Sequence, residues 1–187
     1  GHFGDDRLRS PYWDPILAAE LLNYDQLPVI DYERRMQEWL RDDKDGAEYI
    51  IVTPNNDAWA EYANQLKDYR RRQGIITEVY RLDEMPATNT TMMKQWFHNA
   101  YNTWEIAPVA VCLLGDHGSN MSQYIPAETT SHPSNGSCIT DNFYADAVGN
   151  DNLPDMVFSR LIAQNANELP IFVGKQIEYE YTNPNMD

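Results

Sequence analysis

From Glu48 onwards, short apolar runs alternate with longer stretches in which apolar residues recur every three to four positions. The runs EYIIVTP, GIITEVYRL and PVAVCLLGD, which begin at Glu48, Gly74 and Pro108, are nearly continuous, as strands buried on both faces require. Between them, residues 56–73 and 91–104 have the spacing of helices with one buried face. The order strand–helix–strand–helix–strand predicts a parallel sheet with right-handed crossovers.

The helical spacing also predicts which side chains face the core. In the first of these helices they are Trp59, Tyr62, Ala63 and Leu66. In the second they are Met93, Trp96, Phe97, Ala100 and Trp104. Gly74 follows the first helix and suits the left-handed residue that commonly ends one.

The last third of the chain has a different pattern. Residues 115–140 are rich in Ser, Thr, Asn, Pro and Gly, which predicts a long loop. DNFYAD (141–146) and DMVFSRLI (155–162) are interpreted as two antiparallel strands flanking the turn AVGNDNLP. A closing helix is expected from about Asn167, with one face formed by Leu169, Val173, Ile177 and Tyr181. The predicted fold class is therefore α/β with three layers: a mainly parallel sheet flanked by helices, with an antiparallel strand pair near the C-terminus.

The first 46 residues lie outside this alternation and are predicted to form a helical lead-in. Ile16, Leu17 and Leu21 have helical spacing after an Asp-Pro pair that suits a helix start. A second helix is expected from Asp31, with Met36, Trp39 and Leu40 facing inward. It ends in the charged turn RDDKDG, so we divide the chain into a lead-in, residues 1–46, and an α/β subdomain, residues 47–187.

Charge and cysteine content restrict the function. The 187 residues include 14 Lys and Arg against 29 Asp and Glu, a formal charge of −15, which argues against nucleic acid and anionic membrane as partners. The longest apolar run, residues 106–114, is far below the roughly 20 residues of a membrane span. The two cysteines provide neither a disulfide framework nor zinc-binding spacing.

A ligand site in an open parallel sheet lies beyond the carboxyl ends of the strands, where the strand order reverses. The first strand brings residues 53–56 to that edge, and the third brings residues 115–118. The turn TPNND after the first strand has no glycine, so a phosphate-binding loop is excluded, and no GxSxG serine motif occurs.

His117 is the most suggestive histidine, because it follows a buried strand beside Asp116. A strand-end histidine that activates a cysteine thiolate is one design of cysteine peptidase. Cys112 lies within the third strand, where packing is its expected role, and Cys138 lies in the polar loop. A self-contained peptidase using His117 and Cys138 is one hypothesis. The preferred interpretation is that Asp116 and His117 tie the loop to the sheet.

An acidic turn is the second candidate site. Its possible oxygen ligands surround Gly149 and are Asp141, Asp146, Asn150, Asp151 and Asp155. Calcium takes six to eight oxygens, and Val148 stands where a further ligand would be wanted. An Asn/Asp-Gly turn without a metal explains the same residues. No cofactor is required by these patterns, and calcium is the one candidate ion.

Four segments together resemble the gingipain family of cysteine peptidases. YIIVTPNNDAWAEYANQLKDYRRRQGIITEVY resembles the opening strand–helix–strand of that family, and VCLLGDHG resembles its Gly-Asp-His strand end. TDNFYADAVGNDNLPDMVFSRL resembles its Asp-x-x-Tyr segment and glycine–asparagine–aspartate turn. The ending IEYEY of the closing helix resembles the family's Tyr-Glu ending, so the likeness covers roughly residues 48–181.

The resemblance implies a caspase-like or flavodoxin-like sheet that forms the first of two α/β halves. In that family the catalytic histidine and cysteine belong to the second half, in motifs that this sequence lacks, so no catalytic role is carried onto His117. The implied function is a structural subdomain of a secreted endopeptidase, inactive alone, with the second catalytic subdomain and a peptide substrate as partners. The implied location is extracellular or on the outer cell surface. The alternative from another class is a stand-alone α/β module that binds a partner or calcium.

Overall fold

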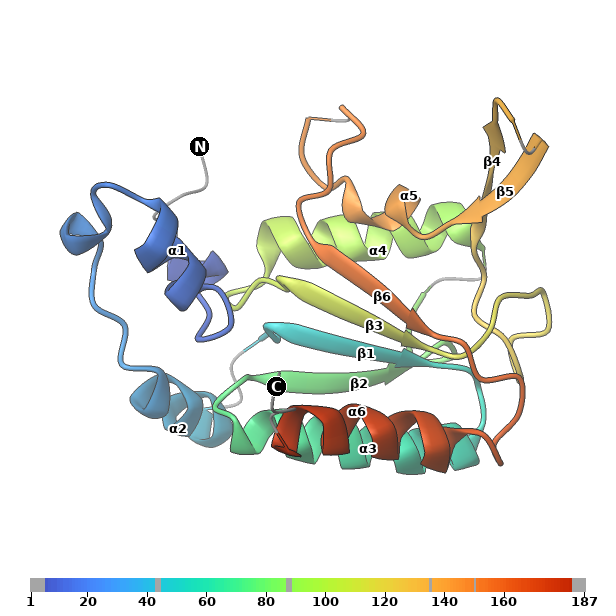
Figure 1. Ribbon diagram of the computed structural model, residues 1–187, viewed down its shortest axis with the longest axis horizontal. Helices are drawn as coiled ribbons and strands as arrows, with labels where there is room; N and C mark the ends of the chain where they lie inside the picture. Colours follow the sequence, from blue (N-terminus) through green and yellow to red (C-terminus); the bar gives the residue numbers. More distant parts are fainter. Residues whose placement is uncertain (1–5, 43–44, 87–88, 135, 150, 183–187) are drawn as a thin grey trace, which may run out of the picture.

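The computed structural model describes residues 6–42, 45–86, 89–134, 136–149 and 151–182 (Figure 1). Its centre is a parallel sheet in the order β2-β1-β3-β6. These strands are β1 (Tyr49–Thr53), β2 (Thr77–Arg81), β3 (Ala110–Leu114) and β6 (Val157–Leu161). β1 and β3 are buried along their whole length, which explains why their sequences are continuous apolar runs.

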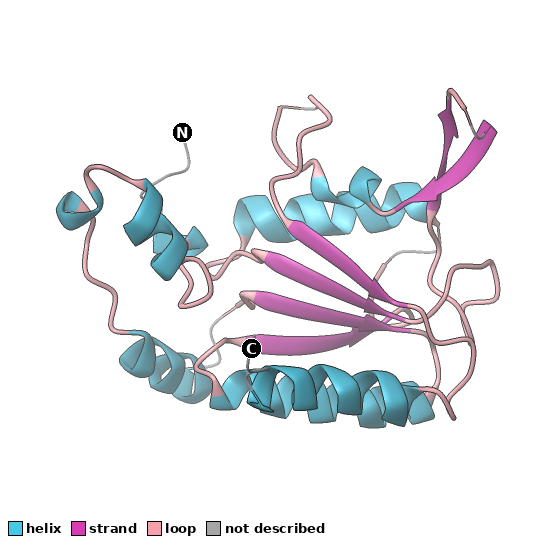
Figure 2. Ribbon diagram, viewed as in Figure 1, coloured by secondary structure: helices cyan, strands magenta, loops and turns pink. Residues whose placement is uncertain are grey.

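Helices cover both faces of the sheet and make the three predicted layers (Figure 2). α3 (Asp57–Arg72) and α6 (Leu169–Thr182) pack on one face, against β1 residues Tyr49 and Ile51. α4 (Thr90–Thr103) and α5 (Asn142–Ala145) lie on the other, where Ile50 and Val52 belong to the core. Successive β1 side chains therefore serve opposite cores, as the pleat of a strand requires.

The ends of the core helices follow from local sequence. The side chain of Asn56 accepts a hydrogen bond from the amide of Ala58 at the start of α3, and Asn89 accepts one from Met92 in α4. Gly74 has a φ of +82°, which confirms the left-handed residue predicted after α3.

The predicted inward faces are largely confirmed. Six of these side chains are buried: Trp59, Ala63, Leu66, Met93, Phe97 and Ala100. Tyr62, Trp96 and Trp104 pack against the core while staying partly exposed. On α6, Leu169 and Val173 are buried, but Tyr181 is 82% exposed, so its inward prediction is wrong.

One predicted strand is a helix. DNFYAD contains α5, in which the consecutive residues Tyr144 and Ala145 are both buried, an arrangement that a strand with one buried face cannot provide. The ring of Tyr144 packs beside Phe97 and Phe158. β6 consequently has no antiparallel neighbour at this place and instead runs parallel to β3.

The antiparallel pair lies earlier in the chain, inside the segment predicted to be a loop. β4 (Glu128–His132) and β5 (Gly136–Thr140) form a two-stranded sheet that projects from the α4 side in Figure 1. Most of its side chains are exposed. Because neither face is buried, the sequence has no apolar alternation from which the pair could be predicted.

The lead-in is helical, as predicted. It comprises η1 (Asp6–Leu8), α1 (Asp14–Glu20), η2 (Tyr24–Gln26) and α2 (Tyr32–Asp42). α1 buries no residue, and Leu40 is 61% exposed, which contradicts its inward prediction. Trp39 is buried, and its indole N–H donates to the carbonyl of Gly46 at 3.0 Å. None of the described helices has the length and apolar character to cross a bilayer.

A buried carboxylate joins the lead-in to the sheet. Glu48 is 1% exposed, and its Oε2 accepts the amide hydrogen of Ile76 at 3.1 Å. Its Oε1 lies 3.4 Å from Nη1 of Arg35 on α2. Burial raises the pKa of Glu48 to about 7, although the Arg35 guanidinium opposes the rise.

Candidate functional site

The strand order places a reversal point between β1 and β3. The chain passes from β1 to β2 on one side and then to β3 on the other, so the carboxyl ends of β1 and β3 form the crevice expected to bind ligands. Residues 53–56 and 115–118 lie there, as predicted from the sequence.

The polar residues after β1 are engaged by neighbouring loops. The amide of Asn55 donates to the carbonyl of Met121 at 2.7 Å, and its side-chain oxygen accepts from the amide of Asp83 at 2.7 Å. Asn56 caps α3 and also donates to the carbonyl of Ser122. These contacts hold the loop after β3 over the end of β1.

Asp116 joins that loop to two strands. Its amide donates to Ala163 and its carbonyl accepts from Ile125, at 3.1 and 2.9 Å. Oδ1 accepts the backbone N–H of His117 at 2.7 Å and lies 2.9 Å from the ring Nδ1. Burial opposes the effect, but the hydrogen bonds from His117 hold the pKa of Asp116 below its usual value. The side chain of His117 is 49% exposed.

A buried arginine braces the same region. Nε and Nη2 of Arg160, in β6, donate to the two carboxylate oxygens of Asp141 at 2.8 and 2.7 Å. Nη1 donates to the carbonyls of Gly115 and Ile125 at 3.1 and 3.2 Å. The hydroxyl of Tyr144 donates to Pro126 at 2.8 Å. Asp141 and Tyr144 belong to the Asp-x-x-Tyr segment, so that motif fixes the loop that carries His117.

Sequence reasoning did not single out Arg160. A charged residue within an apolar strand was the available signal, because it requires a partner when the strand is buried. Asp141, considered as a calcium ligand, instead has both carboxylate oxygens bonded to this guanidinium.

The two cysteines occupy different environments. Cys112 is 1% exposed inside β3, and burial raises the pKa of its thiol to about 11, consistent with packing. Cys138 is partly exposed in β5, opposite Thr130. In the described part of the chain, no hydrogen bond joins Cys138 to His117, and no group of three or more His, Cys, Asp or Glu side chains could hold a metal ion.

The acidic turn is organised by its own backbone. Oδ2 of Asp155 accepts the amides of Ala147 and Val148 at 2.8 and 2.7 Å. Asp146 accepts the amide of Asn152, and Asp151 that of Leu153. The fourth candidate ligand, Asn150, lies outside the described residues. Calcium binding stays a prediction, and the alternative of a metal-free turn accounts for the contacts seen.

The sheet, the brace and the strand-end Asp-His pair agree with comparisons to known proteins. The model of peptidase family C25 matches residues 42–187. The chain belongs to peptidase family C25. No curated protein sequence matches it.

Solved structures give the same fold for this C25 chain. A complex of Porphyromonas gingivalis RgpB pro- and mature domains matches with a TM-score of 0.56 and 20% identity, covering 71% of this chain. A structure described as a protease matches with a TM-score of 0.58, 23% identity and 73% coverage. The Arg-specific cysteine proteinase gingipain R (RGPB) matches with a TM-score of 0.52, 21% identity and 72% coverage. The match spans only 29%, 29% and 28% of those chains, respectively.

Proposed function

We propose that this chain is the first, structural α/β subdomain of a secreted C25 cysteine endopeptidase and is inactive without the second. The observation that carries the proposal is the family match over residues 42–187, combined with coverage of less than a third of each gingipain-like chain. A family of cysteine peptidases needs a thiolate and an acid–base group. The buried thiol of Cys112 does not fit that role.

The carboxyl edge supports a structural role. Its polar groups serve the loop itself: Asp116 binds His117, and Arg160 binds Asp141 and three carbonyls. Catalysis would therefore use a cysteine and a histidine of the second subdomain, which attack the peptide carbonyl and protonate the leaving amine. A peptide is the substrate of this proposal, and the extracellular space or outer cell surface is its location.

The test uses the gene product at its natural length. A peptide-based thiol alkylator is added, and the modified cysteine is identified by mass spectrometry. The proposal expects modification that abolishes peptide cleavage at a cysteine other than Cys112 and Cys138. A gene product without cysteine-dependent peptidase activity would contradict it.

A further inference from the structure

β6 is an edge strand whose outer side is uncovered. Within the described residues its ladder partner is β3 alone. Val157 and Leu161 stand beside Ala110 and Leu114, which are buried under α3 and α6. Val157 is nevertheless 46% exposed, because α6 lies over the inner strands.

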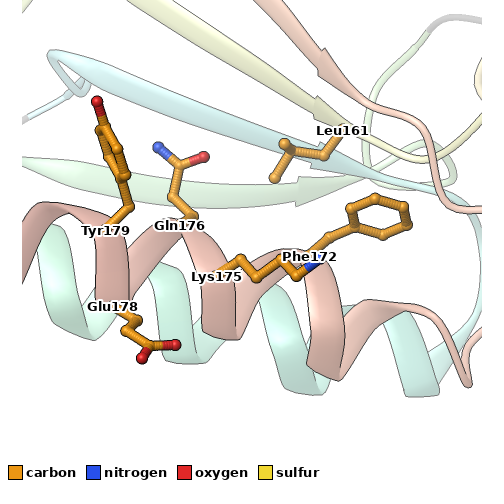
Figure 3. A pocket seen from close by; sticks show the side chains of 6 residues that line it. All are labelled: Leu161, Phe172, Lys175, Gln176, Glu178 and Tyr179. Carbon is orange, nitrogen blue, oxygen red and sulfur yellow. The ribbon is translucent and has the colours of Figure 1, made fainter.

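A groove runs between this strand and α6. It has a volume of about 590 Å³ and is lined by Leu161, Phe172, Lys175, Gln176, Glu178 and Tyr179 (Figure 3). The spacing of Phe172, Lys175, Gln176 and Tyr179 is i, i+3, i+4 and i+7, so they form a second helical stripe. The first stripe, with Leu169 and Val173, is already buried in the core. α6 therefore presents two faces suited to packing, and one has no partner among the described residues.

The position of α6 is fixed, so the helix cannot roll across β6 to fill the groove. Arg70 of α3 donates to the two carboxylate oxygens of Glu180 at 2.5 and 2.8 Å. Gln176 donates to the same carboxylate at 2.8 Å. Arg70 is 5% exposed and also lies 5.2 Å from the centre of the Tyr49 ring.

Handedness decides against the simplest occupant, a strand that directly follows α6. α6 lies on the same face as α3, which connects β1 to β2. A right-handed crossover through α6 would therefore place a parallel strand towards the β2 side, away from β6. The outer edge of β6 is left for a separately folded unit.

Charge decides against a second copy of this chain. Each copy has a formal charge of −15, so two copies repel one another. The groove itself carries one cation, Lys175, and one anion, Glu178, among mainly uncharged neighbours. Such a surface suits an uncharged or weakly cationic partner. The gingipain-like chains are more than three times the length of the matched part, which leaves room for another folded unit.

We propose that the groove between β6 and α6 is the surface on which the second, catalytic α/β subdomain docks. This inference rests on the proposed function. Leu161, Phe172 and Tyr179 supply the apolar contacts, and the outward amides of β6 supply backbone donors. Those amides belong to Phe158 and Arg160, because Val157 already donates to Val109 and hydrogen bonding alternates along a strand.

Hydrogen exchange compares the natural-length gene product with the 187-residue chain. We expect peptides covering residues 157–162 and 171–180 to exchange at least tenfold more slowly in the longer, monomeric protein. Peptides covering β2, on the opposite edge, should exchange equally in both. Unchanged exchange at the groove would overturn the inference. Protection that appears only as the protein dimerises would assign the groove to a second copy and overturn it equally.

Two matched variants provide the second readout. Tyr179→Lys, in the groove, should lower peptidase activity of the natural-length protein at least fivefold. Tyr181→Lys, on the same helix but outside the groove, should change it less than twofold. Both residues are more than two-thirds exposed, so neither change should shift the thermal midpoint of the 187-residue chain. Equal activities of the two variants would overturn the docking site. A natural-length protein without peptidase activity would instead overturn the proposed function.

Discussion

Arg160 and Asp141 form a bidentate pair, with nitrogen–oxygen distances of 2.7 and 2.8 Å, that fastens the edge strand β6 to the start of α5. The side chain of Arg160 is 9% exposed and that of Asp141 is 20% exposed. The same guanidinium reaches carbonyls in the loop after β3, so one residue fixes three segments at the carboxyl edge of the sheet.

Removing this brace should be costly. Arg160→Met leaves the carboxylate of Asp141 and three carbonyls without their donor in a partly buried site. We expect the free energy of unfolding to fall by about 3 kcal/mol, measured by urea denaturation, as is usual when one partner of a buried pair is removed. Arg34→Met, at a 73% exposed side chain, is the matched control and should change it by less than about 0.5 kcal/mol. Equal effects of the two substitutions would show that Arg160 is not a brace.

Glu48 should make stability depend on pH. Its pKa is about 7 in the folded chain, against about 4.5 when unfolded, so its contribution is fully present below pH 4.5 and is lost as the pH rises through 7. Relative to Glu48→Gln, the native protein should lose on the order of 3 kcal/mol of unfolding free energy between pH 4.5 and 8, since one pKa unit corresponds to about 1.4 kcal/mol. Urea denaturation across this range measures the difference. Parallel pH profiles of the two proteins would refute the assignment.

The two thiols should differ in reactivity. Cys112 is buried with a raised pKa, whereas Cys138 is partly exposed in a hairpin. We expect iodoacetamide at pH 8 to modify Cys138 in the native chain and to reach Cys112 only after denaturation, because the thiolate is the reactive form. Peptide mapping by mass spectrometry gives both extents. Rapid native modification of Cys112 would mean that β3 is not packed as described.

Calcium should have little effect on the acidic turn. The carboxylate of Asp155 already accepts two loop amides, so Asp155→Ala should lower the unfolding free energy by about 2 kcal/mol with or without calcium. We expect the thermal midpoint of the native chain to be the same in millimolar calcium and in excess chelator. A rise with calcium that Asp155→Ala abolishes would instead establish a metal site.

The parallel core was predictable because it is buried on both faces. Residues such as Ile50 and Val52 form apolar runs that leave no choice of register or face. Where burial is partial, the hydropathy pattern loses this information. Tyr144 in α5 is buried by the rings around it, which are distant in sequence, and the strand assignment there was wrong.

The candidate site was predicted in position but not in detail. The strand ends identified Asp116 and His117, because the reversal of strand order follows from the sequence of elements. The role of Arg160 depends on Asp141 and on carbonyls up to 45 residues away, and such contacts cannot be read from spacing. The exposed hairpin of β4 and β5 has no hydropathy pattern, so neither its strands nor the place of Cys138 was predictable.

The most direct test of the central claim is the peptidase activity of the 187-residue chain alone. The chain and its Cys138→Ala variant are assayed on a fluorogenic peptide library, beside the natural-length gene product. The account predicts no cleavage above background by either short chain, and cysteine-dependent cleavage by the longer protein. Cleavage by the 187-residue chain that disappears in Cys138→Ala would contradict it.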